Sequence, residues 1–339
     1  MEAMASFDPD NAAPADSGIF GLPNTPADAK VVLIPVPFEA TTSYGGGTAD
    51  GPRAVLKASR QVDLFDLDTG RPYEVGIAML DESPEIRQWN NEAKRMAAPI
   101  IAGGGEGDHA DGLRAVNERC ERMNGWVYET TKRLLAEGKR VGLLGGDHST
   151  PFGCIKAHAE MYPEMGILHL DAHADLRDAY EGFTWSHASI MFNVVMKVPE
   201  VKKLVQVGIR DFCEAEFEMI EASNGKIETF FDANLARSKL GGMAWREMVD
   251  NLVSVLPHNV YLSFDIDGLD PTLCPHTGTP VPGGLSFHEV TGLLEGIARA
   301  GKKIVGFDLN EVAPGPEGEW DGNVAARLLY KMIGWMLKT

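Results

Sequence analysis

The sequence predicts an α/β fold in which a mainly parallel β-sheet lies between helices on both of its faces. Short β-rich segments alternate along the chain with segments of helical periodicity, as in successive β-α-β units. Several of the β-rich segments are apolar on both faces of the pleat, as burial between two helical layers requires. Neither an internal repeat nor a linker divides the chain, so we predict one domain.

The individual elements follow from the hydrophobic pattern. The first strand is predicted in KVVLIPVP, at residues 30–37, which has the pattern of a buried strand. Further strands are predicted at 140–146, 165–171, 203–210, 226–231, 259–267 and 303–312. Helices are predicted at 117–138, 244–256, 286–301 and 323–337.

Two regions lack this alternation. Residues 1–28 are rich in Ala, Pro and Asp without a period, and we interpret them as a flexible arm or an oligomer-packing tail ahead of a single domain over residues 29–339. Residues 80–116 combine glycines with many charges and predict an elaborated loop with at most one short helix. We expect His109, in this loop, to be an exposed histidine rather than a ligand.

The composition argues against several classes of function. With 44% hydrophobic and 24% charged residues, the chain resembles ordinary soluble globular proteins. Its apolar runs are far shorter than the ~20 residues that cross a bilayer, and no secretory signal is visible. A net charge of −18 makes nucleic acid and anionic membranes improbable partners. Four widely spaced cysteines favour reduced thiols and a cytoplasmic location.

Polar side chains follow three of the predicted strands where each strand ends, in the segments LLGGDHST, ILHLDAHADLR and YLSFDIDGLDP. The potential metal ligands in these segments are His148, Asp171, His173, Asp175, Asp265 and Asp267. Sites in open α/β sheets form beyond the carboxyl ends of the strands. Side chains two residues apart on an extended segment point to the same face, so each group is expected to converge on one spot.

Four carboxylates in one place repel one another and are costly to desolvate without cations. Two divalent ions would supply the compensating charge. The mixed Asp oxygen and His nitrogen ligands favour Mn²⁺, Fe²⁺, Co²⁺, Ni²⁺ or Zn²⁺ over Ca²⁺ or Mg²⁺. A water shared by two such ions has a lowered pKa and can hydrolyse a trigonal carbon or a phosphoryl centre. The sequence therefore predicts a hydrolase with a dinuclear metal centre.

Each motif also has a purely structural interpretation. Asp147 or Ser149 could cap the helix that follows GGDHS. DAHAD could imitate a calcium-binding loop, although a histidine stands where an oxygen ligand belongs, and DIDGLDP could be a turn with Asx caps. The presence of all three motifs at strand ends of one chain favours the metal centre.

At these residues the sequence resembles the ureohydrolase family, which includes arginases and agmatinases and splits guanidinium groups to release urea. The resemblance covers most of the chain from residue 30 and rests on GGDHS, DAHAD, SFDIDGLDP, TGTPVPGGLS and FDLNEV, while TTSYGGGTADGPRAVLKAS is most like agmatinases. It implies a three-layer α/β/α fold with a mainly parallel sheet of about eight strands. It also implies two divalent ions, usually Mn²⁺ and in some relatives Ni²⁺, and assembly into trimers or hexamers.

The resemblance further implies a role for each site residue. One ion would be held by His148, Asp171, Asp175 and Asp265, and the other by His173, Asp171, Asp265 and Asp267, so that Asp171 and Asp265 bridge. His187, in WSHAS, matches a histidine that shuttles a proton to the leaving amine, and Glu311, in LNEV, matches a carboxylate that pairs with the guanidinium. Both roles suit the chemistry of these side chains. We predict His187, Asp175 and Glu311 as catalytic residues. Without the resemblance, a helix-start histidine and a surface acid are the simpler interpretations.

The segment 175–195 leaves the substrate open. It lacks the polar residues with which arginases bind the amino-acid head, and FNVV replaces an Arg-rich continuation found in many agmatinases. Arg177 is a candidate for binding a carboxylate-tailed substrate or for a structural salt bridge, and Trp185 is a candidate for the mouth of the site. Agmatine is the first candidate substrate. Guanidine, guanidinobutyrate, guanidinopropionate, arginine and formimidoylglutamate are the alternatives.

Two other classes of function compete with a guanidino hydrolase. A metallophosphoesterase is disfavoured because the chain has no early D-x-H motif and no cluster of Arg and Lys to clamp a phosphate. A non-catalytic subunit of the same fold is disfavoured because all the predicted ligand positions carry competent residues.

Overall fold

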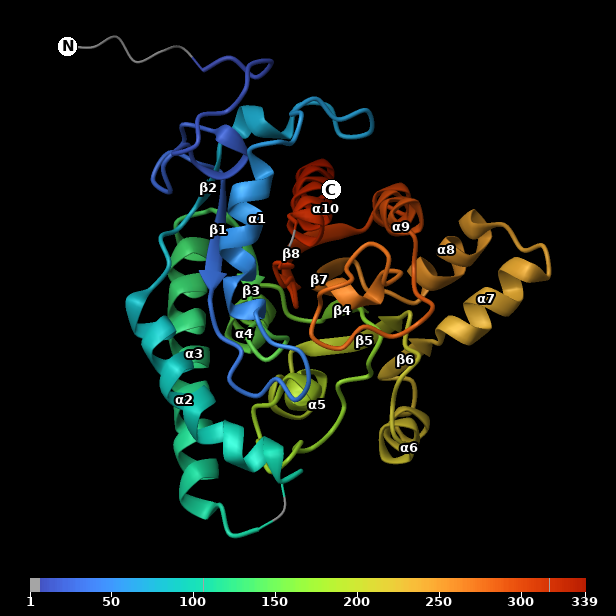
Figure 1. Ribbon diagram of the computed structural model, residues 1–339. Helices are drawn as coiled ribbons and strands as arrows, with labels where there is room; N and C mark the ends of the chain where they lie inside the picture. Colours follow the sequence, from blue (N-terminus) through green and yellow to red (C-terminus); the bar gives the residue numbers. More distant parts are fainter. Residues whose placement is uncertain (1–6, 106, 317) are drawn as a thin grey trace.

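A computed structural model describes residues 7–105, 107–316 and 318–339. Within these ranges, eight parallel strands form one sheet in the order β2-β1-β3-β8-β7-β4-β5-β6 (Figure 1). The predicted α/β class, the parallel sheet and the number of strands are confirmed. None of the helices in the described ranges is long and apolar enough to span a membrane.

The strands are β1 (Val31–Val36), β2 (Ile77–Met79), β3 (Arg140–Gly145), β4 (Met165–Leu170), β5 (Val201–Val207), β6 (Ile227–Phe230), β7 (Asn259–Asp265) and β8 (Lys303–Asn310). The α-helices are α1 (Gly51–Ser59), α2 (Pro84–Ala102), α3 (Ala110–Ala136), α4 (Phe152–Met161), α5 (Ile190–Lys197), α6 (Glu214–Ala222), α7 (Asp232–Leu240), α8 (Trp245–Ser254), α9 (Phe287–Arg299) and α10 (Trp320–Lys338). Two 3-10 turns that matter below are η1 (Ile19–Gly21) and η4 (His187–Ser189). The sequence did not reveal β2, which is too short to show a period.

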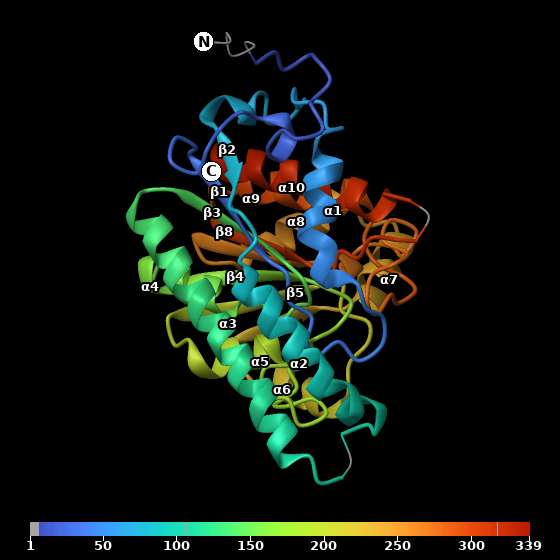
Figure 2. The ribbon, with the colours of Figure 1, turned by 60° about the vertical axis from the view of Figure 1, so that its left-hand side comes forward.

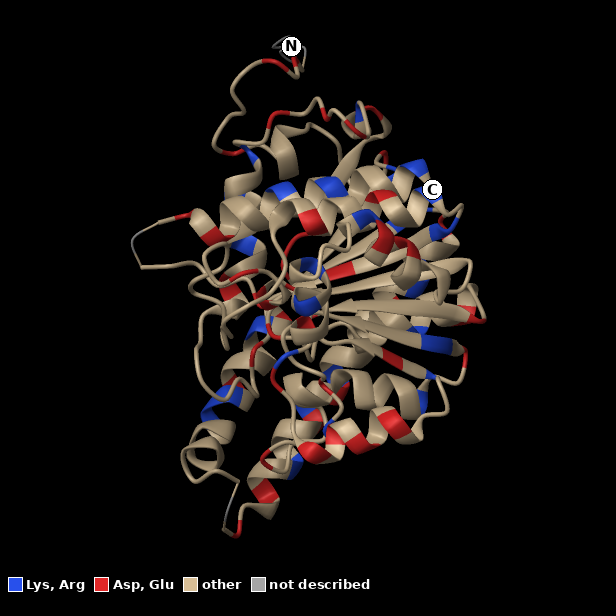
Figure 3. Ribbon diagram, turned by 90° about the vertical axis from the view of Figure 1, so that its right-hand side faces the viewer, with Lys and Arg blue, Asp and Glu red and all other residues tan. Residues whose placement is uncertain are grey.

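The sheet separates two hydrophobic cores. In β1, Val31 and Leu33 point into one core and Val32 and Ile34 into the other, as the alternation of a strand dictates. Helices α1, α8, α9 and α10 cover the first core, and α2, α3, α4 and α5 cover the second (Figure 2). Most of the charged positions lie on these outer helices and on the loops (Figure 3). The strands are therefore buried on both faces, as their continuous apolar runs predict.

The segment 80–116 is not the loop that we predicted. Helix α2 fills residues 84–102 and α3 begins at Ala110, so only a short connection remains between two long helices. In α2 the residues Ile86, Ala93, Ala97 and Ile100 are buried on one face, and the charged residues occupy the other. The prediction was wrong because the charged, solvated face of this amphipathic helix gives the segment the local composition of a polar loop.

Part of the predicted arm packs onto the body of the protein. Ile19, Phe20 and Leu22 are buried, and the Phe20 N–H donates to Ser59 Oγ at 2.9 Å. The Phe20 ring lies 4.9 Å from that of Tyr330 in α10, measured between centroids. Residues 1–6 lie outside the described ranges, and a boundary between arm and domain at residue 28 stays a prediction.

Candidate metal centre and active site

Four neighbouring strands lead into the predicted site. Strands β3, β8, β7 and β4 lie side by side in the centre of the sheet and point the same way. His148 follows β3, Asp171 follows β4, Asp265 ends β7 and Glu311 follows β8. The topology therefore gathers residues that are far apart in the sequence at one edge of the sheet.

The imidazole of His148 is surrounded by carboxylates. Its Nδ1 lies 3.0 Å from Asp171 Oδ2, 3.4 Å from Asp175 Oδ2 and 3.3 Å from Asp265 Oδ2. All four side chains are buried, and one N–H cannot serve three carboxylates. Burial, together with neighbouring negative charge, raises the pKa values of Asp175 and Asp265 well above their usual range. The chemistry of this donor set therefore fits a bound cation.

The far side of the His148 ring determines which nitrogen faces the carboxylates. Ser263 Oγ donates to Asp308 Oδ1 at 2.9 Å and so accepts the hydrogen of His148 Nε2 at 3.0 Å. The lone pair of Nδ1 is then available to a metal ion. Burial lowers the pKa of His148, but the hydrogen bond to Asp171 and the nearby carboxylates outweigh it and raise that pKa to about 10. The carboxylates that favour a proton on this ring also favour a bound cation beside it.

A second group of ligands adjoins the first. His173 Nδ1 lies 3.1 Å from Asp267 Oδ2 and 3.4 Å from Asp171 Oδ1. Asp171 belongs to both groups, because its Oδ2 faces His148 and its Oδ1 faces His173. The structure thus brings the six predicted ligands together around a shared carboxylate. The assignment of each ligand to one ion stays a prediction.

His169 belongs to this cluster and was missed in the sequence. Its Nε2 lies 2.8 Å from Asp171 Oδ2, and its Nδ1 lies 3.1 Å from the amide nitrogen of Gln206. The same amide nitrogen donates to the Ala174 carbonyl at 2.7 Å, which fixes the orientation of the amide. Gln206 therefore donates to Nδ1, and His169 donates from Nε2 to Asp171. Burial lowers the pKa of His169, so it orients Asp171 as a neutral ring.

The helix-capping interpretation of GGDHS was wrong, because α4 begins at Phe152 with Pro151 at its N-cap and has no side-chain cap. Asp147 forms a local turn with Ser149 instead. Its Oδ1 accepts the backbone N–H of Ser149 at 3.0 Å and the Ser149 hydroxyl at 2.5 Å. Its Oδ2 accepts from the Thr41 hydroxyl at 3.4 Å. An Asx contact also occurs in DIDG, where Asp265 Oδ1 accepts the Asp267 N–H at 2.8 Å, while Asp265 Oδ2 still faces His148. Capping and a place in the cluster are compatible at Asp265.

Glu311 presents a carboxylate oxygen without a partner. Its Oε1 accepts the backbone N–H of His148 at 2.9 Å, whereas its Oε2 is buried with no hydrogen-bond partner among the described residues. Burial and then Asp265 raise the pKa of Glu311 well above its usual range. A Cβ at Gly278 would stand 3.1 Å from Oε2, so glycine leaves space beside this oxygen. A buried acceptor of this kind suits a planar N–H donor such as guanidinium.

His187 lines a cleft that is also lined by the predicted metal ligands His173 and Asp175. It begins η4, and its backbone N–H donates to Thr41 Oγ1 at 3.2 Å. Its ring stands edge-on to Tyr180, with 6.0 Å between centroids. Burial lowers the pKa of His187 to about 4, so the ring is neutral near pH 7.

The outer walls of the cleft carry Arg177, Tyr180, Asp211, Phe212 and Glu216. Arg177 Nε lies 3.8 Å from Glu216 Oε2, and its guanidinium lies 4.9 Å from the centre of the Tyr180 ring. The salt bridge that we considered for Arg177 is thus present, and a role in substrate binding stays a prediction. The indole nitrogen of Trp185 instead donates to Glu121 at 3.3 Å, away from this cleft.

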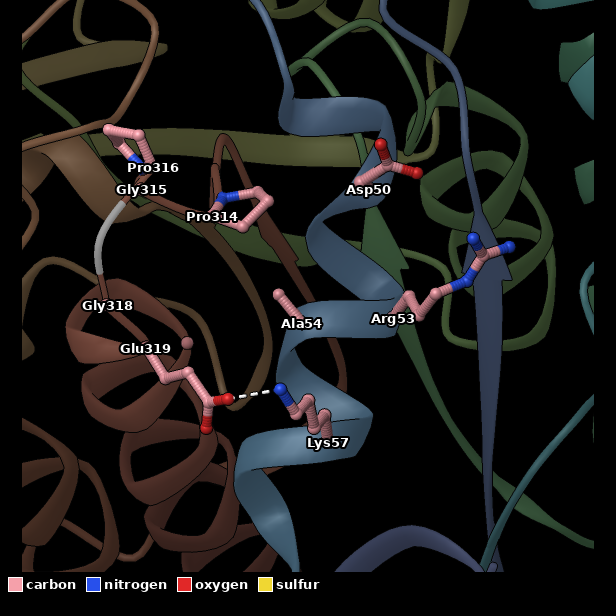
Figure 4. A pocket seen from close by; sticks show the side chains of 10 residues that line it. Asp50, Arg53, Ala54, Lys57, Pro314, Gly315, Pro316, Gly318 and Glu319 are labelled. Atoms are coloured by element: carbon pink, nitrogen blue, oxygen red, sulfur yellow. Dashed lines mark ion pairs between the residues drawn. The ribbon is translucent and has the colours of Figure 1, made fainter.

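A separate hollow lies between α1 and the segment that leads into α10 (Figure 4). Arg53 and Lys57 of α1 line one side, with Pro314 and Glu319 opposite, and Lys57 forms an ion pair with Glu319. Its lining includes none of the predicted metal ligands, nor His187 or Glu311. The cleft beside His173 is therefore the better candidate for the active site.

The chain is similar in sequence to enzymes of one family. The arginase family model matches residues 29–334. An N(1)-aminopropylagmatine ureohydrolase from Thermus thermophilus is 35% identical over 319 residues, which cover 93% of this chain and 94% of the relative. An agmatinase from Halalkalibacterium halodurans is 34% identical over 311 residues, which cover 91% and 93%.

Solved structures agree on the fold. The agmatine ureohydrolase of Thermoplasma volcanium matches with a TM-score of 0.72 and 24% identity, over 95% of this chain and 94% of that one. The arginase of Medicago truncatula matches with a TM-score of 0.66 and 25% identity, over 91% and 88%. The family model and the sequence relatives span nearly the whole described chain and include both groups of ligands. The chain therefore belongs to the arginase family of metal-dependent ureohydrolases.

Proposed function

We propose that this enzyme hydrolyses a guanidino C–N bond in a small compound with a cationic tail, agmatine first, and releases urea. The observation that carries this proposal is the buried Oε2 of Glu311, which lacks a hydrogen-bond partner in the described part of the chain while Oε1 accepts from the His148 backbone. A guanidinium bound to this oxygen would lie at the edge of the cluster, where hydrolysis can occur. The family and its agmatinase relatives support this reaction.

The chain's own residues supply binding and proton transfer. Glu311 accepts N–H groups of the guanidinium and fixes the orientation of its plane. When bound, two divalent ions lower the pKa of water and so supply a nucleophile near neutral pH. His187 is neutral, so it can accept a proton as attack proceeds and deliver it to the departing amine. An alkyl amine needs that proton, because its anion is a very poor leaving group.

The charge of the cleft favours a cationic tail. The carboxylate of Glu216 is already opposite Arg177, so this pair contributes little net charge. Asp211 lines the cleft as an exposed carboxylate without an ion pair among the described residues. Tyr180 and Phe212 add aromatic surface for an aliphatic chain. A substrate amine therefore finds a counter-charge here, and a substrate carboxylate does not.

We propose manganese as the native metal, with nickel as the alternative. His nitrogen and Asp oxygen ligands suit both ions and disfavour an all-oxygen ion such as Ca²⁺. The family resemblance favours manganese. Metal analysis of protein purified without added metal, compared with the activity restored by each ion, would distinguish the two.

A substrate panel crossed with metals tests the proposed function. Protein loaded with Mn²⁺, Ni²⁺, Co²⁺ or Zn²⁺ is given agmatine, guanidine, guanidinobutyrate, guanidinopropionate, arginine and formimidoylglutamate, and urea and ammonia are measured. We expect urea from agmatine, at a kcat/KM above that for the carboxylate-tailed compounds. Failure of every guanidino compound to yield urea with every metal would refute the proposal.

Assembly and location are part of this proposal. We expect trimers or hexamers, as the family resemblance implies, which light scattering coupled to gel filtration would measure. We also expect a cytoplasmic enzyme. The four cysteines are all free, and Cys120, Cys154 and Cys274 are buried, which suits a reducing compartment.

A further inference from the structure

The turn that carries His187 is held by one side chain of the next helix. Asn193, in α5, is 1% exposed. Its Nδ2 donates to the Thr184 carbonyl at 2.8 Å and to the Ser189 carbonyl at 2.9 Å. These two carbonyls stand on either side of His187 in the sequence. One buried amide therefore bridges the two ends of the turn.

Helix α5 is itself tied to the metal cluster. The backbone N–H groups of Met191 and Phe192 donate to the Asp175 carbonyl at 3.1 and 3.0 Å. Asp175 adopts a left-handed backbone conformation, with φ of 54°, which turns the chain at this point. Asn193 thus connects the His187 turn to a helix whose first turn is bonded to a predicted metal ligand.

The outer side of the same turn rests on α3. The Thr184 N–H donates to Asn117 Oδ1 at 3.1 Å, and the Trp185 indole donates to Glu121 at 3.3 Å. These contacts fix residues 184 and 185, but neither reaches the residues that follow His187. Within the turn, Ser186 Oγ accepts the Ala188 N–H at 3.2 Å. The two hydrogen bonds of Asn193 join the outer ends of the turn, residues 184 and 189, to each other and to α5.

We propose that Asn193 is a positioning residue, which holds His187 at the distance from the cleft that proton delivery to the leaving amine requires. This inference rests on the proposed function. Asn193 lies in the FNVV segment, and its short neutral amide spans the turn without burying a charge.

Asn193→Leu tests the proposal, because leucine has a similar volume and no donor. Asn193→Ser keeps a donor for the carbonyl four residues earlier, Ser189, and cannot reach Thr184. Leu293→Ala, in α9 on the opposite face of the sheet, is the control for a general loss of stability. All three proteins are loaded with manganese, and their metal content is measured before kinetics.

The kinetic measurement compares two alkylguanidines that differ only in fluorine substitution beside the leaving nitrogen. The fluorinated amine departs more easily and depends less on a proton donor. We expect Asn193→Leu to lower kcat for the unsubstituted compound about tenfold or more, with a much smaller loss for the fluorinated one and little change in KM. Asn193→Ser should lie between wild type and Asn193→Leu, and Leu293→Ala should lose activity equally on both compounds.

Hydrogen exchange gives a second measurement that does not depend on activity. The amides of residues 186–189 should exchange faster in Asn193→Leu than in wild type, while those of β4 and β7 remain protected. Equal losses on both compounds, or unchanged exchange in the turn, would overturn the role of Asn193. If wild type releases no urea from any guanidino compound, the proposed function fails, and this inference fails with it.

Discussion

At the scale of single residues, hydrogen bonds to the far ring nitrogens of His148 and His169 determine how these histidines face the site. His148 is fixed through Ser263, so that Nδ1 faces the carboxylates. His169 is fixed through Gln206, so that its proton points at Asp171. In both cases a hydrogen bond on the far nitrogen determines what the near nitrogen can do.

His169 also shows which parts of the site could be predicted from the sequence and which could not. The same two-residue spacing that predicted Asp171, His173 and Asp175 extends back to His169, which was therefore visible in HLDAHAD. What the sequence could not show is Gln206, which lies on the adjacent strand β5 and fixes the tautomer of His169. Such contacts depend on strand order, which single-sequence patterns do not contain.

Replacing His169 should weaken metal binding without removing a ligand. We expect His169→Phe to lower metal affinity about 10- to 100-fold, because Asp171 loses the donor that orients it. Calorimetric titration with Mn²⁺ measures this, with His288→Gln as the control, since His288 is exposed on α9. An unchanged affinity in His169→Phe would show that Asp171 needs no such support.

Replacing Glu311 should lower the activity of the enzyme without lowering its stability. A carboxyl whose pKa is raised by folding costs stability at any pH above its unfolded pKa, and Glu311 is such a group. We expect Glu311→Gln to be at least as stable as wild type at pH 7 in urea unfolding. Its kcat/KM should fall about 100-fold or more, because the charged acceptor for guanidinium is lost.

Glu295→Gln, on the exposed side of α9, is the matched control and should change neither property. The interpretation of Glu311 fails if Glu311→Gln keeps wild-type kcat/KM, or if it unfolds at much lower urea concentration than wild type.

At the scale of elements, the long buried strands were predictable and their order was not. Each apolar run, such as residues 259–267, predicts a buried strand. The neighbouring positions of β3, β8, β7 and β4 bring together residues that are more than a hundred positions apart, and no local pattern encodes this. Helix α2 was missed for the opposite reason, because its charged face dominated the local composition.

The segment η1 should contribute to stability although it lies within the predicted arm. We expect Phe20→Ala to lower the free energy of unfolding by about 3 kcal/mol, because the buried ring leaves a cavity between α1 and α10. Phe7→Ala is the control, since Phe7 is 40% exposed. Equal urea midpoints for the two variants would mean that η1 does not pack as described.

At the scale of the whole molecule, a net charge of −18 surrounds a site that itself needs positive charge. The acidic field attracts divalent cations and cationic substrates and repels anionic ones. The buried carboxylates around His148 make folding without metal costly, so metal binding and stability are linked. The position of Asp171 between the two ligand groups could not be predicted from composition and required the fold.

The most direct test is a manganese titration of metal-free protein, with urea release from agmatine and the melting temperature followed at each addition. We predict that both rise together and that urea release saturates at about two ions per chain. Asp171→Ala removes the carboxylate shared by both ligand groups. In this variant, added manganese should produce no urea release and should not raise the melting temperature. No urea at any manganese content, or the same response in Asp171→Ala, would contradict the assignment of this cluster as the catalytic metal centre.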